Sequence, residues 1–82
     1  MRRTYSRHVF DTTVVEDREE GWIAVDLYST LDDKRERVAR VTYWDAIGGF
    51  TVETSGSLVP LVIIEELISE ARAIVQEPKG NA

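Results

Sequence analysis

The stretch GWIAVDLYST, residues 21–30, carries the pattern that decides the fold. Every second residue from Ile23 to Leu27 is aliphatic, as expected for a strand that buries one face in a core. The opposite face carries Trp22 and Tyr28, at positions where a soluble protein normally exposes polar side chains. The segment therefore predicts a strand with one buried face and a second, aromatic face that needs another explanation.

Three further segments are rich in β-branched or alternating apolar residues and predict strands: HVFDTTVVE (8–16), RVARVTYWD (37–45) and GFTVET (49–54). The links between successive strands are short and contain polar residues or glycine. Because links of this length join antiparallel neighbours, the four strands are expected to form a meander.

A helix is expected after Pro60, since proline is well suited to the first turn of a helix. Apolar residues then recur at steps of three and four, which is typical of an amphipathic helix. The predicted buried stripe consists of Leu61, Ile64, Ile68, Ala71 and Val75, widened by Leu67 and Ile74. The predicted fold class is α+β: a four-stranded antiparallel β-meander with one C-terminal α-helix packed on one face (ββββα).

The bulk composition bounds the domain and its surroundings. A chain of 82 residues has room for one core, so residues 1–82 are expected to form a single domain, with an ordered core of about residues 5–77 and a flexible tail. No cysteine, signal-peptide pattern or apolar run of membrane length is present, so a cytoplasmic protein is expected. The acidic net charge of −5 argues mildly against a general nucleic-acid binder.

The core residues also predict the register of the sheet, because residues that share a core must share a face. Pairing the aliphatic positions of residues 21–30 with those of residues 37–45 leaves a three-residue loop at residues 32–34. The expected pairs on the far face are Trp22 with Trp44, Asp26 with Arg40, and Tyr28 with Val38.

The sequence carries no pattern typical of an enzyme. His8 is the only histidine, and no candidate partner for proton transfer is marked near it. The acidic doublets lack the spacing of calcium loops or two-metal sites, and Gly48–Gly49 is not followed by the helix start and lysine of a phosphate-binding loop. A non-enzymatic protein without metal or cofactor is therefore the expectation.

The aromatic face supports three interpretations. The first is an interaction module that forms a homodimer or binds a small protein partner, because Trp, Tyr and Arg dominate interface energetics. Its predicted contact residues are Trp22, Tyr28, Val38, Arg40 and Trp44. Another interpretation is that the aromatic face is a purely structural layer, covered by the first strand or by the N-terminal arm.

The remaining interpretation is binding of single-stranded nucleic acid, with bases stacked on the aromatic rings next to Arg35, Arg37 and Arg40. A four-stranded meander followed by a helix is also the order of elements in the single-strand-binding transcription-coactivator and Whirly-type proteins. That similarity concerns topology alone and includes no shared motif.

Overall fold

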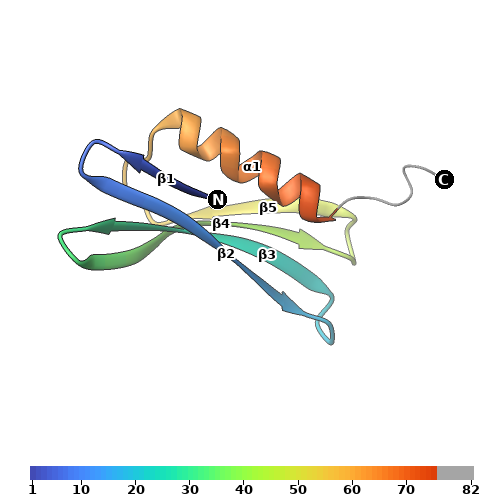
Figure 1. Ribbon diagram of the computed structural model, residues 1–82. Coiled ribbons are helices and arrows are strands. Elements are labelled where there is room, and N and C mark those ends of the chain that lie inside the picture. The colour runs from blue at the N-terminus through green and yellow to red at the C-terminus, as the bar shows by residue number, and fades with distance from the viewer. Residues whose placement is uncertain (76–82) are drawn as a thin grey trace.

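A computed structural model describes residues 1–75 of the chain, so the predicted flexible tail lies outside the described residues. Five antiparallel strands form one sheet in the order β1-β2-β3-β4-β5, and one helix follows them (Figure 1). The elements are β1 (Arg2–Tyr5), β2 (His8–Asp17), β3 (Trp22–Leu31), β4 (Lys34–Trp44), β5 (Gly49–Thr54) and α1 (Leu61–Val75). The α+β class, the antiparallel meander and the C-terminal helix are confirmed.

The predicted number of strands was one too few, because the basic N-terminal segment forms β1. This segment has no alternation of apolar and polar residues, so nothing local marks it as a strand. It pairs with β2 in a register that places Arg3 opposite Phe10. The Arg3 guanidinium reaches the helix, where its Nε donates a hydrogen bond of 3.0 Å to Glu66 Oε2. Pairing and helix contacts, rather than local propensity, therefore define this strand.

The hydrophobic core lies between α1 and the middle of the sheet, and the helix crosses one face of the sheet (Figure 1). Val25 pairs with Val41 and Leu27 with Ala39, as the core pattern predicted. The buried members of the core are Phe10, Val25, Leu27, Val38, Ala39, Val41, Ile63, Leu67 and Ala71. The predicted orientation of β3, with its aliphatic side chains toward the helix, is confirmed.

The buried stripe of α1 is rotated from the prediction. Ile63, Leu67 and Ala71 are its buried residues, whereas Leu61 is 70% and Ile68 36% exposed. The rotation follows from the other flank of the helix, where Glu66 and Glu70 bond to side chains of β1 and β2. One edge of the apolar stripe is therefore left without cover by its own sheet.

The β3–β4 hairpin contains a bulge that corrects the predicted position of Val38. The turn has two residues, Asp32 and Asp33, both with positive φ (51° and 68°), rather than a three-residue loop. The tighter turn leaves one residue in excess on β4, so the register shifts next to Tyr28 and Arg37 becomes its partner. Val38 is the extra residue. It is 3% exposed and lies in the core on the helix side of the sheet, so it cannot form part of the face away from the helix.

Candidate interaction surfaces

The back face, which is the side of the sheet away from α1, carries the two tryptophans. Trp22 and Trp44 are directly opposed across β3 and β4, with ring centroids 6.2 Å apart and planes tilted by 53°. Trp44 Nε1 also donates a hydrogen bond of 2.8 Å to Thr51 Oγ1 on β5. Both indoles are only half-exposed in the isolated chain. The predicted tryptophan pair is confirmed, and much of its surface is already covered within the molecule.

A buried ion pair occupies the centre of the back face. The Asp26 carboxylate is 3% exposed and accepts two hydrogen bonds from Arg40, at 2.6 Å from Nε and 3.0 Å from Nη2. Arg37 Nη1 lies 3.7 Å from the same carboxylate, and it reaches there because the bulge re-aims this part of β4. The hydrogen bonds that Arg40 donates to Asp26 raise the pKa of Arg40 above its usual value.

A second arginine is stacked on an aromatic ring further along the back face. The Arg35 guanidinium carbon lies 3.7 Å from the centroid of the Tyr28 ring, and its Nη2 donates to Asp11 Oδ2 at 2.8 Å. The hydrogen bond to Asp11 raises the pKa of Arg35. Arg40 lies in a similar but looser position, 5.5 Å from the ring centroid of Trp22. Aromatic rings and acidic residues of the same sheet therefore engage both guanidiniums.

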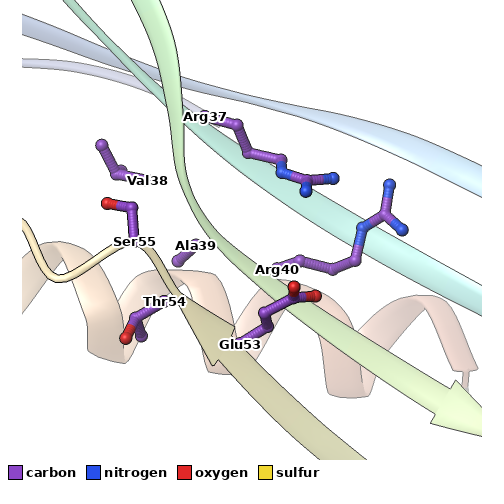
Figure 2. Close-up of a pocket in the computed structure, with 7 residues that line it drawn as sticks. All are labelled: Arg37, Val38, Ala39, Arg40, Glu53, Thr54 and Ser55. Atoms are coloured by element: carbon purple, nitrogen blue, oxygen red, sulfur yellow. The ribbon is translucent and has the colours of Figure 1, made fainter.

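Four of the five predicted contact residues, Trp22, Tyr28, Arg40 and Trp44, lie on the back face, and Val38 does not. Figure 2 shows the side chains of Arg37 and Arg40 running in the same direction, with Val38 pointing away from them. The hollow drawn there has a volume of about 90 Å³. That volume is well below the roughly 300–1,000 Å³ of small-molecule pockets. It is lined by Arg37, Val38, Ala39, Arg40, Glu53, Thr54 and Ser55.

The most exposed apolar side chains lie elsewhere in the molecule. Phe50 and Val52 are 38% and 59% exposed on β5, on the helix side of the sheet, since they pair with Tyr43 and Val41. Among the described residues, none of the exposed large apolar side chains is on the back face. These are Tyr5, Val14, Ile47, Phe50, Val52, Leu58, Leu61, Val62 and Ile68.

The exposed stripe of α1 lies toward β5. Glu66 and Glu70 mark the flank that faces β1 and β2, because they bond to Arg3 and Thr12. At about 100° per residue, Leu61 and Ile68 fall on the opposite flank of the helix. We call the surface formed by Phe50, Val52, Leu61 and Ile68 the α1–β5 flank. The feature of the sequence that indicated this surface was the unusual width of the apolar stripe of the helix. The pattern could not show which edge of that stripe stays uncovered.

Neither a metal site nor a membrane span is found in residues 1–75. No cluster of three His, Asp or Glu side chains in this range could hold a metal ion. The single helix within it is too short and too polar to cross a membrane. Comparisons with protein-family models, with curated proteins and with solved structures find no match to this chain.

Proposed function

We propose that this protein is a non-enzymatic interaction module that self-associates through the α1–β5 flank. The observation that carries the proposal is the group of exposed aliphatic and aromatic side chains next to an edge strand, with Val52 at 59% and Leu61 at 70% exposure. Large apolar side chains that a small domain leaves exposed often belong to an interaction site. A second copy is the simplest partner, since closed homodimers are the commonest oligomers.

The back face supports the same general function less well. Its aromatic rings contact arginines or each other, and Asp26 is already neutralised by Arg40. A partner docking there would gain little newly buried apolar area, because the tryptophans are half-covered in the single chain. The proposed contact therefore moves from the back face to the α1–β5 flank.

Sedimentation velocity of two matched variants tests the proposal. Val52 and Val14 are strand valines on the helix side of the sheet, 59% and 49% exposed, on opposite sides of α1. Val52→Ser is expected to weaken dimerisation by about 30-fold, the effect of losing one interface hot spot. Val14→Ser is expected to leave the dissociation constant unchanged.

Two outcomes would overturn the proposal. The first is a wild-type chain that remains monomeric up to its solubility limit. The second is an equal loss of association in Val52→Ser and Val14→Ser, because that result would place the contact outside the α1–β5 flank. Thermal unfolding of both variants at low concentration checks that each monomer is still folded.

Single-stranded nucleic acid is the second candidate ligand, supported by the stacking of Arg35 on Tyr28. Binding to phosphates would require Arg35 and Arg40 to give up Asp11 and Asp26 in exchange. The chain is also acidic, with a net charge of −5. Both facts lower the expected affinity for nucleic acid relative to self-association.

A further inference from the structure

We infer that two copies of the chain associate by antiparallel pairing of their β5 edges, so that one continuous sheet crosses the dimer. This inference rests on the proposed self-association and specifies its geometry. Among the described residues the sheet has two edges, β1 and β5, and each has one row of backbone groups not paired within the sheet. Such a row is a template for another strand. The question is which edge is open to a second copy and in which register.

The two edges differ in charge and in length. β1 has only four residues with the sequence RRTY, so an antiparallel pair of β1 edges would be short and would concentrate four arginines in it. β5 has six residues with the sequence GFTVET, and Glu53 is its only charged residue. It contains neither the lysine nor the proline that commonly protects an exposed edge. The β5 edge is therefore the one suited to pairing with its own copy.

The hydrogen bonds to β4 determine which groups of β5 face outward. Ser55 N–H donates to the Val38 carbonyl at 3.1 Å, so the backbone of residue 55 points toward β4. Because these directions alternate along a strand, residues 49, 51 and 53 also bond to β4. The N–H and C=O groups of Phe50, Val52 and Thr54 consequently point to the open edge.

The outward-facing groups favour one register. Centring the two-fold axis on Val52 pairs Val52 with its own copy and Phe50 with Thr54 of the other copy, which uses all three outward-facing residues of each strand. The same register sets Thr51 opposite Glu53 and brings no like charges face to face. Shifting the axis to residue 53 would oppose two copies of Glu53. An axis at residue 51 leaves Thr54 unpaired within the strand.

This arrangement also accounts for the apolar side chains beside the edge. The two copies of Val52 would meet at the two-fold axis on the helix side of the sheet, with Phe50 of each copy two residues further along its strand. The exposed flanks of the two helices, with Leu61 and Ile68, would lie on either side of them. Since each β5 edge is used once, the contact is isologous and closes at a dimer instead of growing into a filament.

Amide hydrogen exchange followed by NMR on the wild-type chain tests the pairing. The amides of Phe50, Val52 and Thr54 are expected to exchange at least tenfold more slowly at concentrations where the dimer forms than at concentrations where the monomer predominates. The Thr51 and Glu53 amides bond to β4 in both states and serve as internal controls. Dimerisation without slower exchange at residues 50, 52 and 54 would overturn the β5 pairing and leave the proposed self-association intact. A chain that never dimerises would overturn both.

A cross-linking experiment tests the register, and the absence of cysteine from the sequence makes it specific. Directly opposed Cα atoms in a hydrogen-bonded antiparallel pair lie about 5.5 Å apart, within the usual range for a disulfide. Val52→Cys is expected to form a disulfide-linked dimer in mild oxidant, whereas Val14→Cys is expected to remain monomeric on a non-reducing gel. Equal cross-linking of the two variants would contradict the register centred on Val52.

Discussion

The two surfaces that could bind a partner differ in how much of their bonding capacity the chain itself satisfies. On the back face, Trp44 donates to Thr51, Arg35 stacks on Tyr28, and Arg40 holds the buried Asp26 carboxylate. On the α1–β5 flank, Val52 and Leu61 are 59% and 70% exposed, and the neighbouring edge strand has unpaired backbone groups. The residue types typical of interfaces are concentrated on the first surface, but the unsatisfied surface is the second.

Residue composition and uncovered apolar surface therefore point to different faces of this molecule. Tryptophan, tyrosine and arginine can satisfy one another on an open sheet face, as they do on the back face of the single chain. Aliphatic side chains have no such option and remain exposed wherever the fold does not reach them. On this basis we expect variants of the back face to lose stability and variants of the α1–β5 flank to lose association.

The largest expected effect on stability comes from the centre of the back face. Arg40→Met removes the bidentate partner of Asp26, whose carboxylate is 3% exposed, and leaves Arg37 at 3.7 Å as its nearest cation. Losing one partner of a buried pair is expected to cost on the order of 3 kcal/mol in urea unfolding. Arg35→Met, at a more solvent-exposed pair, is the control and is expected to cost clearly less. Equal losses would show that Asp26 does not depend on Arg40.

A matched pair of valines gives the next effect. Val38 is 3% exposed in the core, and Val52 is 59% exposed on the α1–β5 flank. Val38→Ala is expected to reduce the free energy of unfolding by about 2 kcal/mol, for two methyl groups and the resulting cavity. Val52→Ala is expected to change monomer stability by less than about 0.5 kcal/mol and to weaken the dimer. The reverse pattern would return Val38 to the surface and argue against the bulge.

A smaller loss of stability is expected from the tryptophan pair. Trp44→Ala removes the contact with Trp22 and the hydrogen bond to Thr51, at a cost of about 1.5 kcal/mol for a half-exposed aromatic pair. The dimer dissociation constant is expected to remain unchanged, as measured by sedimentation at a temperature where the variant is folded. Dissociation of this variant into folded monomers would instead favour the back face as the contact surface.

The smallest expected effect is that of nucleic acid. Tryptophan fluorescence is expected to show no saturable change when a mixed-sequence single-stranded oligonucleotide is added at low salt, because Asp11 and Asp26 already engage the arginines beside the rings. The same titration with Asp11→Asn shows whether releasing Arg35 creates affinity. Saturable, salt-dependent binding by the wild-type chain would contradict the proposed function and support the second candidate.

Much of the fold could be predicted from local patterns. Alternation in residues 21–30 and 37–45 predicted the opposed pairs Trp22–Trp44 and Asp26–Arg40, because a shift of one residue would bury Arg40 in the core. The strand formed by Arg2–Tyr5 could not be predicted, since its residues are charged or polar and only pairing with β2 and contact with α1 define it. Val38 was predicted on the wrong face of the sheet, because a bulge reverses side-chain direction without changing composition.

Local residues were enough to predict the order of β2 to β5 and α1 and the side of each central strand that faces the core, because hydrophobic periodicity and short antiparallel links are local properties. The rotation of α1 and the position of the bulge could be read only from the folded structure. The rotation depends on Glu66 and Glu70 meeting side chains of β1 and β2, and the bulge depends on a two-residue turn at Asp32 and Asp33. The contacts of Glu66 and Glu70 join residues far apart in the chain, and the orientation that they give α1 leaves Leu61 and Ile68 exposed.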